Sequence, residues 1–390
     1  MPSRPSPASP AYDLSVPFSR STYEARLAVI RATLASQQID ALVVTHPPNV
    51  RYLTSVAASA GAAFVTDADL YLITDFRYAA AVERRLDELE LRGLVTPLVG
   101  EQPPEQVMAS LAAESQLGRV GVEVAHTTIE QHGRLVAALG PRMELLAVSE
   151  VVETARLRKD EQEIAVLRAA AVRLSDVAAG VLSEVVRPGR TETEVAAEIE
   201  WRLRRGGFSR PAFDTIVASG PNSAMPHATP TERVLADGDA VVLDFGGVYN
   251  GYCVDLSRTV LLGSPSAKLV QMHEAVCEAQ QAAIAVLCPG VAPEAVDAAA
   301  RDSLARAGLA EAFAHSTGHG LGLEVHEAPR LGRRQSWTAP SPPLEKGIVC
   351  TIEPGAYVVG LGGVRIEDDV LVTANGCELL TRVDRAWRVR

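Results

Sequence analysis

The 390-residue sequence predicts two domains, an α/β domain followed by a larger α+β domain. Up to about residue 150, short apolar segments alternate with amphipathic helical segments, which is typical of an α/β fold. Beyond that point the order changes to a helix pair, an apolar hairpin, a second helix pair and a run of strands. This order predicts helices covering one face of a mostly antiparallel sheet, as a repeat of architecture without a repeat in the residues themselves.

The α/β domain is predicted over residues 21–155, after a flexible tail at 1–20 that is rich in Pro and Ser. The tail lacks the apolar centre of a signal peptide. Residues 22–45 indicate an amphipathic helix and then a short buried strand. The strand–helix alternation continues through the segments 49–56, 62–66, 69–74, 105–116 (helical) and 118–124.

The α+β domain is predicted over residues 156–390, with the boundary at about 153–160. Its first helix begins with the acidic turn "KDEQE" and carries apolar residues on one face, which suits a helix N-terminus and a core-facing helix. The predicted helices cover 160–185, 191–206, 266–287 and 292–307, and the predicted strands cover 214–219, 240–249 and 252–261, with further strands to the end.

Composition limits the classes of function. The net charge of −11 argues against nucleic acid as a partner. No run of 18 apolar residues occurs, so we expect no membrane-spanning segment. The five cysteines are odd in number and form no CxxC pair. We therefore expect a reduced, cytoplasmic protein rather than a disulfide scaffold or a thiolate zinc site.

The segment "AVVLDFGGVYNGYCVDLSRTV" at 240–260 predicts a β-hairpin with acids inside it. An Asn-Gly pair between two apolar runs favours a type I′ turn at Asn250 and Gly251. In that register Asp244 lies opposite Ser257, and Asp255 lies two residues along the strand from Ser257. Both carboxylates therefore leave the same face of the hairpin, as diagonal neighbours.

Two carboxylates placed so close together repel each other, and each loses hydration energy on burial. A multivalent cation between Asp244 and Asp255 would remove both problems. Two alternatives stay open at this point. The Gly246-Gly247 pair could insert a bulge and change the register, and the acids could face solvent or bond to Arg258.

Four further segments of the second domain place ionisable side chains in apolar or glycine-rich surroundings. They carry His227, then His315, His319 and His326, then Glu353, and finally Arg365 with Glu367. A lone histidine such as His227 is often solvated, and Glu353 could simply end a strand. We expect Asp368 and Asp369 to form a solvated acidic edge, and Glu327 to be a surface or supporting acid.

The residue types indicate a metal centre for hydrolysis. Four carboxylates and one imidazole make a hard, oxygen-rich set that suits Mn²⁺ or Mg²⁺ better than structural zinc, with Co²⁺ or Zn²⁺ as alternatives. Four carboxylates exceed what one divalent ion needs, whereas two ions about 3.5–4 Å apart account for the number. Such a pair lowers the pKa of a bridging water and makes a nucleophile at neutral pH.

Four motifs, "DFGGVYNGYCVDLSRT", "HSTGHGLGLEVHEAP", "TIEPGAY" and "GVRIEDD", resemble the metallopeptidases of the pita-bread fold. The resemblance covers residues 156–390 and implies a pita-bread catalytic domain with a dinuclear metal site. The segments "PNVRYLTSV" and "ITDFRYAAAVE" resemble the creatinase-like N-terminal domain of the same proteins. The loop "SVAASAGAA" departs from the glycine-containing turn of many relatives, which bears on substrate specificity rather than on the chemistry.

By this resemblance, Asp244 chelates one metal ion, Asp255 and Glu367 bridge the two ions, and His319 and Glu353 complete the second site. Glu353 is also the expected proton shuttle, which takes a proton from the attacking water and passes it to the leaving nitrogen.

The resemblance also implies roles around the metal ions. His326 and His227 would hold the scissile carbonyl region and stabilise the tetrahedral intermediate. Arg365 would balance charge and fix the carboxylate of Glu367. The residues expected to line the site are His315 and Tyr357.

Within the resemblance, the intact ligand set and the N-terminal domain favour a peptidase acting at Xaa–Pro bonds on small proline-containing peptides. Xaa-Pro dipeptidase (prolidase) is favoured over aminopeptidase P, because longer aminopeptidase P enzymes more often carry an aromatic residue after the metal histidine, where this chain has Gly320. A non-enzymatic pita-bread binding protein is the third alternative, which the five intact ligands and the two extra histidines argue against.

The resemblance implies a homodimer in which the partner's N-terminal domain narrows the mouth of the active site. We expect Arg51, Tyr52, Arg77 or Tyr78 to lie near this interface or mouth, because they belong to the two motifs that mark the N-terminal domain.

Overall fold

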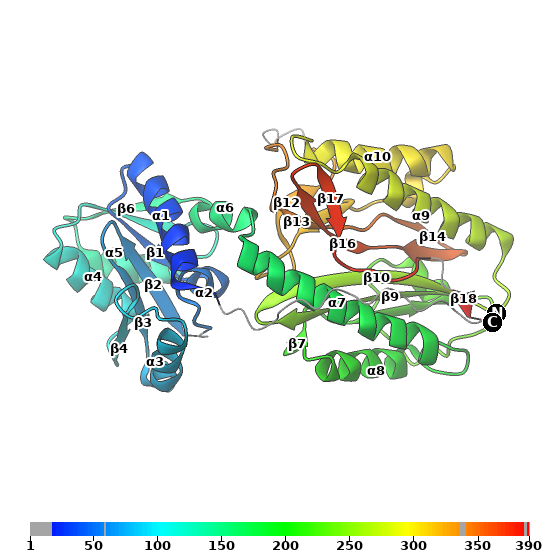
Figure 1. The fold of residues 1–390 in the computed structure, drawn as a ribbon, viewed down its shortest axis with the longest axis horizontal. Coiled ribbons are helices and arrows are strands. Elements are labelled where there is room, and N and C mark those ends of the chain that lie inside the picture. The colour runs from blue at the N-terminus through cyan, green and yellow to red at the C-terminus, as the bar shows by residue number, and fades with distance from the viewer. Residues whose placement is uncertain (1–17, 58–59, 335–340, 386–387, 390) are drawn as a thin grey trace. The chain divides into compact units, whose positions relative to one another are not determined.

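The computed structural model describes residues 18–57, 60–334, 341–385 and 388–389. Their contacts divide the chain into two compact units, one ending at Arg156 and the other beginning at Leu157 (Figure 1). No helix among these residues is both long and apolar enough to cross a membrane.

The N-terminal unit is an α/β unit around one six-stranded sheet, in the order β4-β3-β2-β1-β5-β6. The β1–β2 and β2–β3 pairs are antiparallel and the other three pairs are parallel. Its elements are α1 (Arg20–Ser36), β1 (Ala41–Val44), α2 (Pro47–Thr54), β2 (Gly61–Thr66), β3 (Leu70–Thr74), α3 (Ala79–Glu88), β4 (Thr96–Val99), α4 (Pro104–Glu114), β5 (Arg119–Glu123), α5 (Ile129–Leu139), β6 (Glu144–Val148) and α6 (Val151–Leu157).

The motif that holds Arg51 and Tyr52 forms helix α2, which begins at two prolines because proline suits the first helical turn. The Tyr52 ring is 4 % exposed and lies under the Arg26 guanidinium, and its hydroxyl donates to the Ala155 carbonyl at 3.3 Å. The side chain of Tyr52 therefore belongs to the core of this unit rather than to an interface. Arg77, by contrast, is exposed and paired with Asp75.

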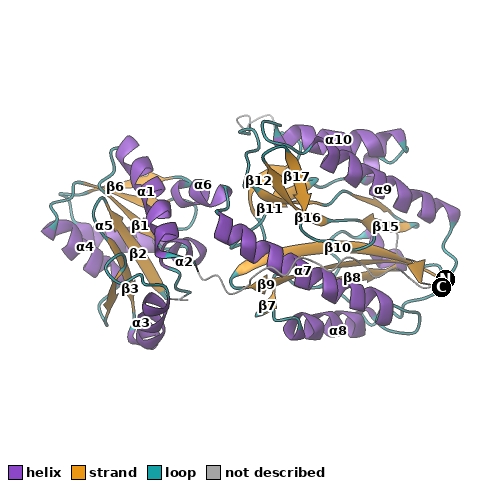
Figure 2. Cartoon of the chain, in the orientation of Figure 1, coloured by secondary structure: helices purple, strands orange, loops and turns teal. Residues whose placement is uncertain are grey.

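The second unit is an α+β unit with two larger sheets and one two-stranded ribbon (Figure 2). The first sheet has the order β18-β10-β9-β7 with β8 also on β9, the second has the order β12-β11-β13-β16-β17, and β14 pairs with β15. Its elements are α7 (Glu161–Glu184), α8 (Glu192–Arg205), β7 (Arg210–Pro211), β8 (Ile216–Ser219), β9 (Ala240–Tyr249), β10 (Tyr252–Leu262), α9 (Ala267–Val286), α10 (Pro293–Arg306), β11 (Gly318–Gly320), β12 (Glu327–Leu331), β13 (Val349–Ile352), β14 (Gly355–Val358), β15 (Gly362–Arg365), β16 (Asp368–Thr373), β17 (Gly376–Leu379) and β18 (Arg388–Val389).

Each of the two larger sheets of this unit is covered by one helix pair, whereas the sequence predicts helices on one face of a single sheet. Helix α7 packs on β9 and β10, and α8 packs on β8. Helices α9 and α10 contribute to one apolar core together with β13 and β16 of the second sheet. Helices α7 and α8 lie on one side of the strands, and α9 and α10 lie on the other (Figure 2).

The hairpin of β9 and β10 has the predicted register. Asn250 and Gly251 both have positive φ, 47° and 85°, as a type I′ turn requires. Asp244 pairs with Ser257, and Asp255 pairs with Gly246, without a register shift. The bulge that the glycine pair made possible is absent from this hairpin, so both aspartates leave the same face.

Gly246 gives the hairpin the close approach that it needs beside Asp255. A Cβ atom at this position would lie 2.2 Å from the Val254 carbonyl oxygen and 2.9 Å from the Phe213 ring. Only a hydrogen atom fits in that space, so the strand tolerates no larger residue there.

We predict that Gly246→Ala destabilises the unit by roughly 1–3 kcal/mol, because the added methyl group forces the two strands apart. Thermal unfolding measures the loss. The matched control is Gly133→Ala in helix α5, where an added Cβ meets nothing within 4 Å. Equal melting temperatures for Gly246→Ala and the wild type would contradict this account of the hairpin.

Candidate metal centre

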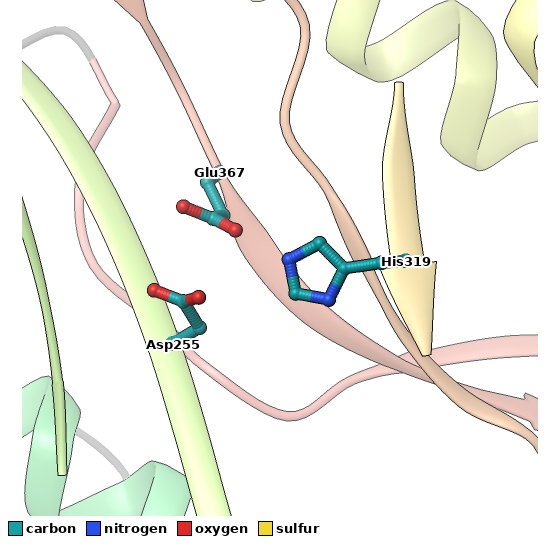
Figure 3. A group of neighbouring side chains, drawn as sticks. All are labelled: Asp255, His319 and Glu367. Carbon is teal, nitrogen blue, oxygen red and sulfur yellow. The ribbon is translucent and has the colours of Figure 1, made fainter. Parts of the chain in front are cut away.

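Three side chains converge where the sheets of the second unit meet. One ligand atom each from Asp255, His319 and Glu367 lies within 4.8 Å of the other two (Figure 3). Asp255 comes from β10 of the first sheet, His319 from β11 of the second, and Glu367 from the link between β15 and β16. The cluster therefore exists only when both sheets are in place.

The other two predicted ligands, Asp244 and Glu353, border this cluster. Glu353 follows β13, and its Oε1 lies 3.4 Å from Nε2 of His319. Asp244 lies on β9 and shares its face with Asp255. All five side chains line one cavity of about 920 Å³.

The tautomer of His319 is set by its own backbone. Its Nδ1 lies 3.0 Å from the Gly320 carbonyl oxygen, so Nδ1 carries the proton and donates it. Burial lowers the pKa of His319 to about 4, so the ring is neutral at neutral pH. Nε2 is therefore a free lone pair on the side of the carboxylates, which is the form that a metal ion needs.

Burial and mutual repulsion outweigh the nearby Arg365 guanidinium at the carboxylates of the cluster. Burial and the neighbouring Asp244 carboxylate raise the pKa of Asp255 well above its usual value. Burial and Asp255 do the same to the pKa of Glu367, and burial raises the pKa of Glu353 to about 7.

Two of these oxygens are left unused by the protein. Among the described residues, Oδ1 of Asp244 and Oδ1 of Asp255 are buried and have no hydrogen-bond donor. Because a buried oxygen without a partner is costly, the pair fits a bound cation. Carboxylate oxygens with one imidazole nitrogen are the donors that hard or borderline divalent ions take.

Arg365 contacts a different carboxylate from the one expected. Its Nη2 donates to Oδ2 of Asp244 at 2.6 Å. Glu367 is fixed instead by the hydroxyl of Ser257, which donates to Oε2 at 2.7 Å. The Arg365 side chain, at the end of β15, therefore reaches Asp244 on β9.

The expectation of a solvated edge at Asp368 and Asp369 is wrong, since both are buried. They begin β16, which lies inside the second sheet between β13 and β17. Asp369 accepts the Asp255 backbone N–H at 3.0 Å, and Asp368 forms a buried ion pair with Arg258 at 2.6 Å. Arg258 therefore does not neutralise the Asp244–Asp255 pair.

Glu327 is also buried, contrary to a surface position. Its Oε2 accepts from Nζ of Lys159 at 3.2 Å, and both side chains are shielded from solvent. The pair holds the turn that ends in His326. Glu327 is thus a supporting acid at the wall of the cavity.

The predicted histidines and Tyr357 surround the cluster. His227 and His326 are exposed and line the cavity, and the His326 ring lies edge-on to His319, with 4.4 Å between centroids. His315 also lines the cavity, whereas Tyr357 is not among the described residues that do.

Tyr357 lies behind the wall and connects Arg365 to His315. Nη1 of Arg365 donates to its hydroxyl at 2.7 Å, and the hydroxyl lies 3.1 Å from Nε2 of His315. Nδ1 of His315 is 2.9 Å from the Ser316 carbonyl, so it carries the proton and Nε2 accepts from Tyr357. Burial lowers the pKa of His315 to about 4, which keeps this ring neutral.

Sequence reasoning missed two residues of the site. Thr351 accepts the His319 N–H at 3.1 Å and donates to Oε1 of Glu353 at 3.3 Å. Arg330 lines the cavity directly opposite His319 in the β11–β12 pair. Their strand positions give the signal: Thr351 is two residues before Glu353, and Arg330 is four residues after His326.

The comparison with known families decides the membership of the chain. Residues 165–374, more than half of it, match metallopeptidase family M24, and residues 26–158 match the creatinase/prolidase N-terminal domain. The chain belongs to metallopeptidase family M24. The α+β unit of this M24 protein has the pita-bread fold, and membership of this metallopeptidase family implies divalent metal ions.

Relatives of this M24 protein align over nearly its whole length. It is 34% identical to the Xaa-Pro dipeptidase of Pyrococcus furiosus over 363 residues, 92% of this chain and 98% of the relative. It resembles the structure of an Xaa-Pro dipeptidase from Bacillus anthracis with a TM-score of 0.88 and 34% identity, covering 94% of this chain and 100% of that one. An X-Pro aminopeptidase from Thermotoga maritima has a TM-score of 0.83 and 31% identity, with 93% and 99% coverage.

We predict that Asp255→Asn loses bound metal and lowers peptidase activity by more than roughly 100-fold, because an amide supplies no negative charge to the ion. The metal-free variant should melt at a higher temperature than the metal-free wild type, since one repelling buried carboxylate is gone. Elemental mass spectrometry, a peptide-hydrolysis assay and thermal unfolding measure these effects. Asp302→Asn, an exposed acid on α10, is the control. Full activity in Asp255→Asn would remove this residue from the metal centre.

Proposed function

We propose that this M24 metallopeptidase is an Xaa-Pro dipeptidase that uses two divalent ions held by Asp244, Asp255, His319, Glu353 and Glu367. The observation that carries the proposal is the convergence of these five side chains on one cavity, with buried oxygens that lack donors. The likeness to Xaa-Pro dipeptidases over nearly the whole chain supports the substrate class.

Two ions fit the donor set better than one. Four carboxylates carry twice the charge that one divalent ion neutralises, and Asp255 and Glu367 lie close enough together to be shared by two ions. We favour Mn²⁺ because the donors are hard oxygens, with Co²⁺ and Zn²⁺ as the other candidates.

Bound divalent ions would lower the pKa of a water molecule and polarise the scissile carbonyl. Glu353 would handle the proton, because its carboxyl group lines the cavity and lies beside His319, where the attacking water would be held. Thr351 fixes Oε1 of Glu353 by a hydrogen bond, so the carboxyl group keeps its orientation while it receives a proton and gives it to the leaving proline nitrogen.

His227 and His326 bind the peptide on the open side of the cavity. Both are exposed, whereas the five proposed metal ligands are shielded, so their rings reach the scissile carbonyl and donate to the oxygen as it gains charge. Arg365 and Tyr357 act from behind. They hold Asp244 and His315 in place through hydrogen bonds of 2.6–3.1 Å.

Arg330 favours a dipeptidase over an aminopeptidase P. Its guanidinium is exposed at the cavity wall and has no hydrogen-bond partner among the described residues, whereas Arg365 in the same cavity is fully engaged. A free cation next to the catalytic groups suits the carboxylate that follows proline in a dipeptide. In longer peptides that carboxylate lies further from the scissile bond.

We also propose a homodimer and a cytoplasmic location. The exposed Phe76, beside exposed Arg77, gives the N-terminal unit an apolar surface point of the kind used in interfaces. All five cysteines are free, which suits a reducing compartment.

A mixed digest tests the proposed function. Chelator-stripped protein is resupplied with Mn²⁺ and given Ala-Pro, Ala-Pro-Gly and Ala-Ala together, and mass spectrometry follows each peptide. We expect Ala-Pro alone to disappear. Release of alanine from Ala-Pro-Gly would establish an aminopeptidase P instead. No cleavage with Mn²⁺, Co²⁺ or Zn²⁺ would overturn the peptidase proposal and favour a binding protein.

We predict that Arg330→Ala lowers kcat/KM for Ala-Pro by roughly tenfold or more, because the substrate carboxylate loses a charge-assisted hydrogen bond. The effect should lie mainly in KM and should nearly vanish for Ala-Pro-amide, which has no carboxylate. The control is Arg333→Ala, an exposed arginine outside the cavity. Equal losses of kcat/KM for Ala-Pro and Ala-Pro-amide would show that Arg330 does not bind the substrate carboxylate.

A further inference from the structure

The loop between β8 and β9 forms one wall of the cavity. Five consecutive residues, 226–230, line it, and His227 is among them. The Pro226 carbonyl also accepts a hydrogen bond from Nη1 of Arg365 at 3.1 Å. The position of this loop therefore decides where His227 stands relative to the metal centre.

The loop has few bonds of its own at the part that faces the cavity. A 3₁₀ turn at Gly220–Ala224 begins it, and the last internal bond, from the Ala228 N–H to the Met225 carbonyl, is 3.3 Å long. His227 and Thr229 are exposed. A segment so weakly bonded to itself takes its position from its bonds to other elements. Ser223 accepts the Gly363 N–H at 2.8 Å and Pro226 accepts from Arg365, and further attachments lie at residues 219, 222 and 231.

A single buried carboxylate holds residues 219 and 231, the two ends of the segment that contains His227. Glu192, the first residue of α8, is fully buried. Its Oε1 accepts from the backbone N–H and the hydroxyl of Ser219, each at 2.7 Å. Its Oε2 accepts from the N–H of Thr231 at 3.0 Å and from the Thr231 hydroxyl at 2.7 Å.

Asn222 adds a third attachment point, since its side-chain amide lies 3.1 Å from each oxygen of Glu192. Every one of these donors belongs to the segment 219–231. Although burial alone would raise the pKa of Glu192, the hydrogen bonds from Thr231 and Ser219 lower it below the usual range. The Glu192 carboxylate is therefore a stable anion, and both of its oxygens accept hydrogen bonds from this loop.

Glu192 does not line the cavity, and the donors to it are all loop residues, so its influence on the reaction must pass through the loop. We propose that Glu192 is a positioning residue of the peptidase, which fixes both ends of the loop 219–231 and thereby presents His227 to the substrate. This inference rests on the proposed function and adds a residue remote from the metal centre to it.

Glu192→Gln tests the proposal, because an amide keeps the size of the side chain but turns a donor toward the N–H groups of the loop. We expect kcat/KM for Ala-Pro to fall by roughly 10- to 100-fold, with metal content unchanged, as a small misplacement of a catalytic group costs this much. The matched control is Glu194→Gln in the same helical turn. Glu194 contacts only the cap residue Thr191, and glutamine serves equally well in that capping role.

A double-mutant comparison separates positioning from general damage. In a His227→Ala background, Glu192→Gln should lower kcat/KM by less than about threefold, because little remains for the loop to position. The full penalty in that background would overturn the proposal, as would wild-type activity of the single variant. Thr231→Val removes the hydroxyl bonds to Glu192, Arg233 and Asn222 but keeps the Thr231 N–H bond to Glu192, so it should give a smaller loss in the same direction.

Amide hydrogen exchange gives a readout that needs no activity. Exchange in residues 219–231 should rise in Glu192→Gln and not in Glu194→Gln, while the hairpin at 240–262 stays protected. Unchanged exchange in the loop would overturn the proposal. A wild type that cleaves none of the peptides would refute the proposed function instead, and the exchange result would still decide whether Glu192 holds the loop.

Discussion

Mutual repulsion among buried carboxylates is the constraint on which the second unit of this protein depends. Asp244, Asp255, Glu353 and Glu367 lie in one cavity whose only directly paired cation is Arg365, among the described residues that line it. The Arg365 guanidinium binds Asp244, the Ser257 hydroxyl binds Glu367, and the Thr351 hydroxyl binds Glu353. The protein leaves two oxygens unpaired, and these are the atoms that a cation would take. The surrounding hydrogen bonds thus shape a site for positive charge without supplying that charge.

The division of labour between the sheets follows from this constraint. One sheet delivers Asp244 and Asp255 from a tight hairpin, and the other delivers His319 and Glu353. Each sheet alone carries too little negative charge to bind a divalent ion. The carboxylates therefore come close enough to repel one another only when the whole unit has folded. Helix pairs on the outer faces hold the sheets against that repulsion by apolar burial, which is insensitive to charge.

The local sequence predicted much of this arrangement. The rest depends on contacts between residues far apart in the chain. The register of the hairpin follows from Asn250 and Gly251, since a two-residue turn fixes every pairing beyond it. The partner of Arg365, the burial of Asp368 and Asp369, and the core position of Tyr52 depend on strands or helices far away in the chain. The spacing of residues in the sequence indicates none of these three features. Glu192 belongs to the same class, because its partners start 27 residues later.

The glycine after the metal-binding histidine has a further consequence. A Cβ atom at Gly320 would lie 2.0 Å from the Ala328 carbonyl oxygen of the neighbouring strand, beside the register shift between β11 and β12. The aromatic residue typical of longer aminopeptidase P enzymes therefore has no space here. Any side chain at this position would require the backbones of β11 and β12 to move apart, so replacing Gly320 means remodelling a strand next to the proposed metal ligand His319.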